Sequence, residues 1–278
     1  MDGFSVFTNL IIDTKAPVAS ANPTGGLYNT TKTVTLTMSE PGKIYYTTNR
    51  TNPTTSSNIY SGPITINTTT TLKYLAGNTS IVYNATYTLD KVPPKAGSNI
   101  KSGLYNTNKI VKLSMNKKGT IYYTINGKTP TKTSKKYTGP ITIKSKSTLK
   151  YLAVDMAGNK SPIYTNKYTI DKTAPKVIST TPKSNTRGKS LTASLTIKFS
   201  EKINKGTKYA KIYIKNITTG KTAKSTVTSI SGNTITIKMT LSRLSLDSYW
   251  VYIPKNAVKG TAGNNTNKYV LKFKTSKY

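Results

Sequence analysis

The stretch Lys32-Thr-Val-Thr-Leu-Thr-Met38 decides the fold, because apolar and hydroxyl side chains alternate along it with a period of two. Successive side chains of a β-strand point to opposite faces, so this pattern predicts a strand with one face in a core and one in water. Val111, Leu113 and Met115 repeat the alternation in the middle of the chain. It continues through the C-terminal third at Leu195/Ile197/Phe199, Ile212/Ile214, Ile235/Ile237/Met239, Tyr249/Val251/Ile253 and Leu271/Phe273. Short alternating runs between Gly, Pro, Asn and Ser predict an all-β chain of antiparallel sandwiches.

An internal repeat organises the first two thirds of the chain. Four motifs return 77 positions later: Gly-Leu-Tyr-Asn-Thr at 26 and 103, Ile-Tyr-Tyr-Thr at 44 and 121, Gly-Pro-Ile-Thr-Ile at 62 and 139, and Thr-Leu-Lys-Tyr-Leu-Ala at 71 and 148. The offset then becomes 81, because the first copy lacks four residues of a loop that the second copy spells Val154-Asp-Met-Ala157. Self-similarity at a fixed period is the sequence mark of tandem structural modules.

The modules end in a common form of junction. Asp13-Thr-Lys-Ala-Pro17, Asp90-Lys-Val-Pro-Pro94 and Asp171-Lys-Thr-Ala-Pro175 each place proline shortly after aspartate. Proline ends a strand ladder and fixes φ, so these segments are expected to be short, stiff linkers. The sequence therefore predicts three tandem β-sandwiches, at 14–90, 91–171 and 172–278, after an orphan strand at 1–13 that resembles the last strand of a preceding repeat.

The repeated motifs resemble a known family. Together with the turns Asn52-Pro-Thr54 and Thr129-Pro-Thr131, they are similar to the Ig-like repeat of the chitobiase/β-hexosaminidase C-terminal type, over about residues 14–171. Residues 174–278 look like a bacterial-type Ig-like domain of surface-layer proteins, on the motifs Phe199-Ser-Glu-Lys-Ile203, Ile230-Ser-Gly-Asn-Thr234, Tyr252-Ile-Pro254 and Ala262-Gly-Asn264. One departure is Gly260, which stands where that pattern has aspartate.

The combination of these modules is similar to the adhesin-like cell-surface proteins of methanogenic archaea. The resemblance implies an all-β chain of three tandem Ig-like sandwiches, an extracellular location at the cell surface, and an adhesive or structural role with no cofactor.

Composition excludes most catalytic chemistry. The chain has no Cys and no His, which rules out thiol nucleophiles, disulfides, Ser-His-Asp triads and Cys/His zinc sites. It has no apolar run of 18 residues, so no membrane span is expected. Of the eight carboxylates, Glu40, Asp155, Glu201 and Asp247 lie outside the junctions and the terminus, and no two are close in sequence. Glycoside hydrolysis needs a carboxylate pair. We therefore expect a protein that is not an enzyme.

Positive charge is concentrated in the second and third modules. Residues 1–90 carry five basic and four acidic side chains, residues 91–171 carry 16 and two, and residues 172–278 carry 21 and two. An AT-rich genome favours lysine codons, but it neither removes Asp and Glu nor leaves one module neutral. The asymmetry predicts a cationic surface that meets a polyanion. Only three residues are arginine and no groove-reading motif is present, so nucleic acid is not the expected partner. An anionic cell-wall polymer, glycan or surface protein is.

Few residues suggest individual sites. Asp155 and Asn159 form a partial oxygen ligand set for calcium, although a turn capped by these side chains explains them as well. Trp250 and Tyr252 share the face opposite Tyr249 and are candidates for a glycan contact, with cross-strand packing as the alternative. Eight sequons are candidates for N-glycosylation: Asn29, Asn49, Asn67, Asn78, Asn84, Asn159, Asn216 and Asn264.

Three hypotheses for the function remain open. The first is a non-enzymatic adhesin-like or structural stalk whose cationic C-terminal modules contact an anionic wall, glycan or partner. The second is a subunit of a surface filament in which residues 1–12 complete the sheet of a neighbouring molecule, because an unpaired strand invites pairing. The same strand also arises if the chain is cut from a longer array. The third is an array of carbohydrate-binding modules.

Overall fold

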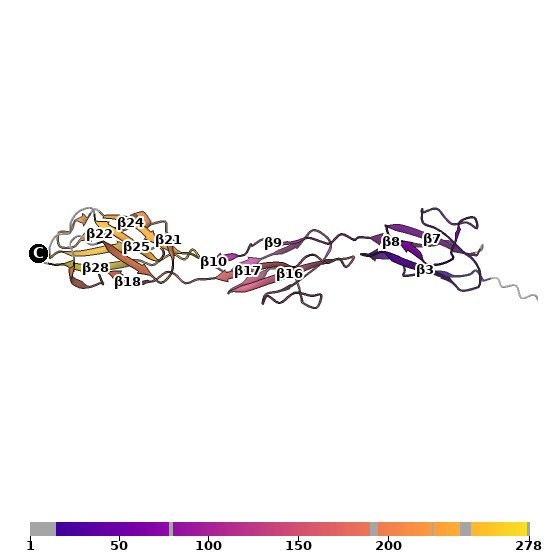
Figure 1. The fold of residues 1–278 in the computed structure, drawn as a ribbon, viewed down its shortest axis with the longest axis horizontal. Helices are drawn as coiled ribbons and strands as arrows, with labels where there is room; N and C mark the ends of the chain where they lie inside the picture. Colours follow the sequence, from indigo (N-terminus) through magenta and orange to yellow (C-terminus); the bar gives the residue numbers. More distant parts are fainter. Residues whose placement is uncertain (1–14, 78–79, 190–193, 224, 240–245, 277–278) are drawn as a thin grey trace, which may run out of the picture. The chain divides into compact units, whose positions relative to one another are not determined.

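The computed structural model describes residues 15–77, 80–189, 194–223, 225–239 and 246–276. Apart from a 3₁₀ turn at Tyr209–Lys211, the regular elements in these ranges are β-strands, and each sheet takes its strands from one of the three sequence segments (Figure 1). This confirms the predicted tandem antiparallel β-sandwiches. The predicted orphan strand at 1–13 lies outside the described residues.

The first segment forms two sheets around one core. Their strand orders are β1 (Ala19–Asn22), β3 (Lys32–Met38) and β6 (Ile64–Ile66), and β2 (Gly26–Tyr28), β8 (Tyr83–Leu89), β7 (Thr70–Ala76), β4 (Ile44–Thr47) and β5 (Asn58–Ile59). The β2–β8 pair is parallel and the other pairs are antiparallel. Val34 and Leu36 point into the core while the threonines of β3 stay exposed, as the alternation predicts. Leu72 and Tyr87 of the facing sheet are fully buried against them.

The second segment repeats this arrangement. Its larger sheet has the order β10 (Gly103–Tyr105), β17 (Tyr164–Ile170), β16 (Ser147–Asp155), β13 (Gly119–Thr124) and β14 (Lys135–Lys136), and its short sheets pair β11 (Lys109–Val111) with β15 (Ile141–Ile143) and β9 (Ala96–Ser98) with β12 (Leu113–Met115). The continuous strand expected over Val111–Met115 is therefore broken at Lys112. There the Asn99 side chain accepts the backbone N–H of Lys112 at 2.7 Å, which replaces a sheet partner.

The third segment is a larger sandwich. Its sheets have the orders β18 (Val177–Thr181), β20 (Leu195–Phe199), β25 (Thr234–Met239) and β24 (Ser225–Ser231), then β19 (Thr186–Lys189), β28 (Tyr269–Thr275), β26 (Ser248–Ile253), β22 (Tyr213–Asn216) and β23 (Thr222–Ala223), and finally β21 (Ile203–Lys205) with β27 (Val258–Gly260). Its core holds Phe199, Ile214, Ile235, Val251 and Leu271, which are all buried.

The density of contacts divides the chain into two compact units. One holds residues 15–97, 114–122 and 152–163, and the other holds residues 98–113, 123–151 and 164–276. The first unit thus includes the part of the second segment that contacts the first segment, and the second unit includes the part that contacts the third. The boundaries 14–90, 91–171 and 172–278 stay a prediction.

Candidate functional site

One loop position carries a charged side chain in each segment, negative in the first and third segments and positive in the second. Its place is fixed by the residue before it, which pairs with the start of the segment through two hydrogen bonds. Ser39 pairs in this way with Val18, Asn116 with Lys95, and Ser200 with Lys176, at 2.7–3.1 Å. The residue that follows is Glu40, Lys117 or Glu201. The repeat alone does not reveal this correspondence in the third segment, because the two kinds of module share little sequence.

In the second segment this position closes what we term the first clasp, formed by Asp90, Lys117, Asp155 and Asn159. Lys117 Nζ lies 2.7 and 2.8 Å from the two carboxylate oxygens of Asp90, and 3.6 Å from Asp155 Oδ2. Asn159 Nδ2 donates to the backbone oxygen of Asp90 at 2.7 Å. The last residue of the first segment is therefore held by both its side chain and its backbone.

The first clasp contains the two residues predicted as calcium ligands. Asp155 is buried, and its two carboxylate oxygens accept the backbone N–H and the side-chain Nδ2 of Asn159 at 2.8 and 3.0 Å. The charge next to Asp155 is the Lys117 ammonium. Among the residues that the structure describes, no three acidic side chains gather as a metal site would require. This geometry favours a side-chain-capped loop with an internal cation, and the calcium site at Asp155 and Asn159 stays a prediction.

Charge shifts the pKa values of the paired groups. The hydrogen bond from Lys117 lowers the pKa of Asp90 below its usual value of 3.8, with help from the backbone N–H of Val92. The same bond raises the pKa of Lys117 above 10.5, against a smaller opposing effect of desolvation. The pair is therefore ionised over the whole neutral range.

The third segment holds Asp171 in a second clasp, formed by Asp171, Glu201, Gly260 and Asn264. Asn264 Nδ2 donates to the backbone oxygen of Asp171 at 2.7 Å, as Asn159 does to Asp90. Gly260 stands at the position of Asp155, and a Cβ on Gly260 would lie 2.5 Å from Glu201 Oε2. The Glu201 carboxylate thus fills the space that a longer side chain at 260 would need. This explains the glycine that departs from the family pattern.

The second clasp has no lysine in the place of Lys117. Desolvation raises the pKa of Glu201, repulsion from Asp171 raises it further, and a hydrogen bond from the Thr261 backbone lowers it slightly. The two clasps share the hydrogen bond from asparagine to the junction aspartate, but the second has a glutamate in place of Lys117 and a glycine in place of Asp155.

The asparagine of the G-L-Y-N-T motif faces each clasp. A Cβ on Gly158 would meet Asn29 Nδ2 at 3.5 Å, and a Cβ on Gly263 would meet Asn106 Nδ2 at 3.4 Å. Both glycines have φ near +93°, a conformation that other residues rarely adopt. Motifs far apart in sequence therefore meet at equivalent places in the two clasps.

Trp250 and Tyr252 lie on the outer face of β26, opposite the buried Tyr249, Val251 and Ile253. Tyr252 stacks on Tyr213 of β22 with ring centroids 4.7 Å apart, and Lys272 Nζ of β28 lies 4.4 Å from the centroid of the Trp250 ring. Each ring thus already has a neighbour on one face. This arrangement favours cross-strand packing. The glycan contact at these two residues stays a prediction.

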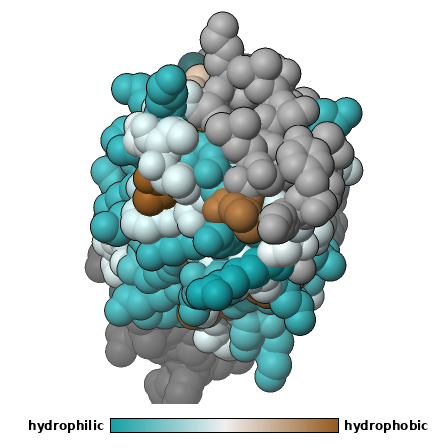
Figure 2. Space-filling model, turned by 90° about the vertical axis from the view of Figure 1, so that its left-hand side faces the viewer, coloured by the Kyte–Doolittle hydropathy of each residue, from teal (hydrophilic) through white to brown (hydrophobic). Residues whose placement is uncertain are grey.

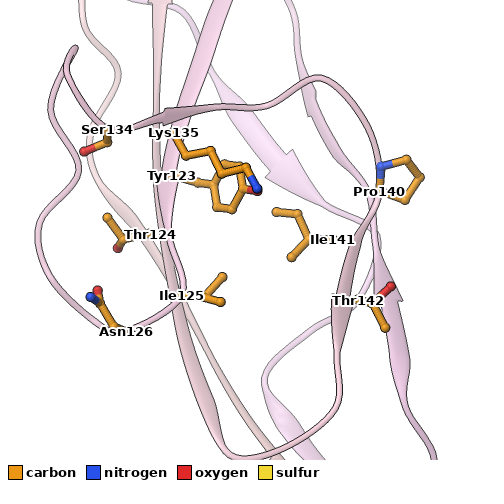
Figure 3. Close-up of a pocket in the computed structure, with 9 residues that line it drawn as sticks. All are labelled: Tyr123, Thr124, Ile125, Asn126, Ser134, Lys135, Pro140, Ile141 and Thr142. Atoms are coloured by element: carbon orange, nitrogen blue, oxygen red, sulfur yellow. The ribbon is translucent and has the colours of Figure 1, made fainter.

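The second segment has a groove of about 500 Å³ beside β13 (Figure 3). It lies between the end of β13, the edge strand β14 and the start of β15. Tyr123, Ile125 and Ile141 give it an apolar floor, and the Lys135 side chain reaches over it. Its lining residues are Tyr123, Thr124, Ile125, Asn126, Ser134, Lys135, Pro140, Ile141 and Thr142. No motif of the sequence indicates this groove.

The predicted glycosylation sites differ in accessibility. Asn49, Asn67 and Asn84 are exposed, Asn29 and Asn264 are half-buried, and Asn78 lies outside the described residues. Asn159 and Asn216 are buried, and their side-chain amides donate to carboxylates: Asn216 Nδ2 lies 2.6 Å from Asp247 Oδ2. A glycan on either buried amide would require local unfolding.

Most of the positive charge has no internal partner. Among the lysines of residues 91–276 whose side chains the structure describes, Lys117 is the one whose ammonium lies within 4.0 Å of a carboxylate. Figure 2, which views the end of the molecule at the left of Figure 1, shows hydrophilic residues over most of the described surface and hydrophobic ones only in small areas. None of the described residues form a helix that is long and apolar enough to span a membrane.

Comparisons with known proteins identify the families of the modules. Residues 23–90 and 100–165 match the family model of the chitobiase/beta-hexosaminidase C-terminal domain, and residues 171–275 match that of the bacterial Ig-like domain. The chain is a tandem of these two kinds of module. The chitobiase-type repeats and the bacterial Ig-like domain are Ig-like modules of the sort found in surface and structural proteins, and they are not catalytic domains.

Several solved structures are similar to this tandem. Three immunoglobulin domains of titin match at 8% identity with a TM-score of 0.44, covering 94% of this chain and 99% of that one. Three N-terminal domains of the highly immunogenic outer capsid protein of bacteriophage RB49 match at 10% identity with a TM-score of 0.40, covering 95% of this chain and 99% of that one. Fibronectin(III)-like modules of Clostridium thermocellum CbhA match at 13% identity with a TM-score of 0.35, covering 55% of this chain and 94% of that one. A search of curated proteins gave no match.

Proposed function

We propose that this chain is an extracellular, non-enzymatic stalk that attaches to an anionic cell-surface polymer through the second chitobiase-type repeat and the bacterial Ig-like domain. The observation that carries the proposal is the uncompensated charge of residues 91–278, which hold 37 basic and four acidic side chains. A soluble module needs far less net charge than this, and the first repeat folds in the same way with a net charge close to zero.

The type of basic residue supports a polymer as the partner. Lysine provides a compact charge without a fixed hydrogen-bonding geometry, which suits a heterogeneous polyanion better than a unique site. The clasps support the role of a stalk, because Asp90 and Asp171 each accept a hydrogen bond from an asparagine of the following module. The chain thus combines spacing modules with a charged end region.

The test is sedimentation of the whole chain with cross-linked polygalacturonate particles, with uncharged dextran particles as a control. We expect binding to polygalacturonate at low salt and release as salt rises, because surface charges are screened within about 8 Å at 0.15 M. Binding to both kinds of particle, or binding that does not change with salt, would contradict the proposal.

A charge-matched pair of variants isolates the role of the lysines. Replacing the exposed Lys176, Lys198, Lys202, Lys238 and Lys259 by glutamine removes five charges, and replacing the same five by arginine keeps them. The glutamine variant should release at clearly lower salt and the arginine variant at about the salt of the parent. Equal behaviour of the two variants would show that charge on this domain does not carry the attachment.

A further inference from the structure

The groove beside β13 combines an apolar floor with one free cation. Ile141 and Tyr123 are almost fully buried at its base, and Ile125 is half exposed beside them. Lys135 Nζ lies 5.9 Å from the centroid of the Tyr123 ring, which holds the ammonium over this floor (Figure 3). No carboxylate of the described residues lies within 4.0 Å of that ammonium. A volume of about 500 Å³ falls in the range of small-ligand clefts, roughly 300–1,000 Å³.

The first chitobiase-type repeat supplies an internal comparison. Seven of the nine lining residues are identical 77 positions earlier, at Tyr46, Thr47, Asn49, Ser57, Pro63, Ile64 and Thr65. The two that differ are Ile125, which replaces Thr48, and Lys135, which replaces Asn58. Both changes alter the same groove, because Ile125 enlarges its apolar floor and Lys135 adds its cation. The two repeats therefore share a scaffold but differ in the chemistry of the groove.

The polar rim completes the chemistry. Asn126 Oδ1 accepts the Lys128 backbone N–H at 3.1 Å, which leaves its NH₂ group directed to donate elsewhere. The Ser134 hydroxyl accepts the Thr131 N–H at 2.9 Å and keeps its own proton for a further bond. The groove thus offers an apolar floor, a single ammonium and a rim that can bind hydroxyls. These features fit a ligand ring that has a hydrophobic face, several hydroxyls and one carboxylate.

We propose that this groove binds one acidic sugar unit of an anionic polysaccharide, with its carboxylate on Lys135 and an apolar ring face over Ile125 and Ile141. The proposal rests on the proposed attachment to an anionic polymer and gives it a specific contact in the second repeat. A phosphate polymer is a poorer match, because a phosphodiester has no apolar face for this floor and the groove offers no arginine fork. The remaining lysines would then add affinity along the polymer without selecting the sugar.

The experiment titrates the whole chain with a galacturonic acid trisaccharide by calorimetry, with a neutral galactose trisaccharide as the reference ligand. The test variant carries Ile125→Thr and Lys135→Asn, which restores the residues of the first repeat and so is expected to fold. The control variant carries Lys136→Asn, which removes the same charge from the neighbouring residue of β14, outside the groove. Thermal unfolding of both variants verifies that they are folded.

We expect the test variant to bind the acidic trisaccharide at least 10-fold more weakly than the parent, the control to change less than about twofold, and the neutral sugar to bind weakly throughout. Equal losses of affinity for the acidic trisaccharide in the two variants, or no loss in either, would overturn the proposal that the groove binds the sugar. Tighter binding of a single-stranded oligonucleotide that is lost in the same test variant would overturn the assignment to a sugar. If the parent binds polygalacturonate particles but not the trisaccharide, the groove proposal fails and the proposed function stands. If it binds neither, both fail.

Discussion

At the residue scale, the position occupied by Lys117 in the second segment and by Glu201 in the third sets the charge beside the junction aspartate. The fixed part of the clasp is an asparagine that donates to a backbone oxygen, and that bond is the same length in both clasps. The variable parts are the residue at position 117 or 201 and the residue at position 155 or 260. A lysine at position 117 neutralises Asp90 and Asp155, whereas a glutamate at position 201 faces Asp171.

Lys117→Met should raise the pKa of Asp90 toward its usual value of 3.8, because the hydrogen bond that chiefly lowers it is gone. Part of the lowering should remain, since the Val92 N–H still donates to Asp90. Carbon-detected NMR titration of the Asp90 carboxyl measures this directly. Lys118→Met is the control, because Lys118 is an exposed neighbour with no ion pair. An unchanged Asp90 titration in Lys117→Met would contradict the ion pair.

The signs of the shifts define a pH range for the first clasp. The pKa of Asp90 is lowered in the fold, so its contribution to stability is complete above about pH 4 and is lost as pH falls through the folded value. The pKa of Lys117 is raised, so its contribution is complete below the usual pKa of 10.5 and is lost as pH rises through the higher folded value. Lys117→Met should remove the alkaline part of this pH dependence of unfolding and reduce the acid part, because the Val92 N–H still donates to Asp90.

At the scale of elements, the strands were predictable and their contacts were not. Alternation placed Leu195, Ile197 and Phe199 on a buried face, and all three are buried. The alternation of apolar and polar residues indicates which face of a strand is buried, but it does not indicate which loop contacts which junction. Lys117 and Asn159 lie 27 and 69 residues from Asp90, and only the fold brings them together.

The groove beside β13 likewise could not be predicted from the sequence. Aligning the two repeats reveals that Thr48 and Asn58 become Ile125 and Lys135, but many other positions change as well. Nothing local indicates that residues 125 and 135 face one space, because they belong to the end of one strand and to the edge strand beyond a loop. An edge strand with two adjacent lysines also reads as protection against pairing with other sheets.

Gly119 is a point where two strands approach too closely for a side chain. A Cβ on Gly119 would lie 2.1 Å from the Val154 backbone oxygen and 2.7 Å from Asp155 Cα. Gly119→Ala should therefore lower the free energy of unfolding by about 1–3 kcal/mol, as overpacking does. Gly139→Ala is the control, since no atom lies within 4 Å of its added Cβ, and it should change stability by less than about 0.5 kcal/mol. Denaturant unfolding of the two variants should separate them, and equal stabilities would contradict the close approach.

At the scale of the whole molecule, two junctions have the same construction and opposite electrostatics. A carboxyl whose pKa is raised in the fold stabilises the fold best when protonated, so the contribution of Glu201 declines as pH rises through 4.5 toward its folded value. Acid thus weakens the first clasp and favours the second.

Converting the second clasp into the first tests this comparison. Gly260→Asp alone should destabilise the chain by about 1–3 kcal/mol, because the new side chain overlaps the Glu201 carboxylate and adds a charge of the same sign. Glu201→Lys together with Gly260→Asp should recover most of that loss, because it recreates the lysine between two aspartates. A double-mutant cycle in thermal unfolding should give a coupling of more than about 0.5 kcal/mol. Strictly additive changes would show that residues 201 and 260 do not share one space.

The clasps also bear on how genes for such chains recombine. The acceptor of the Asn159 amide is Asp90 and that of Asn264 is Asp171, so each module's loop is completed by a residue encoded with its predecessor. An exchange at the proline linker would keep every sandwich whole. It would still leave an asparagine amide without its backbone acceptor unless the incoming neighbour also ended in a residue of matching backbone position. The heritable building block of this array is therefore a module together with the tail of the one before it.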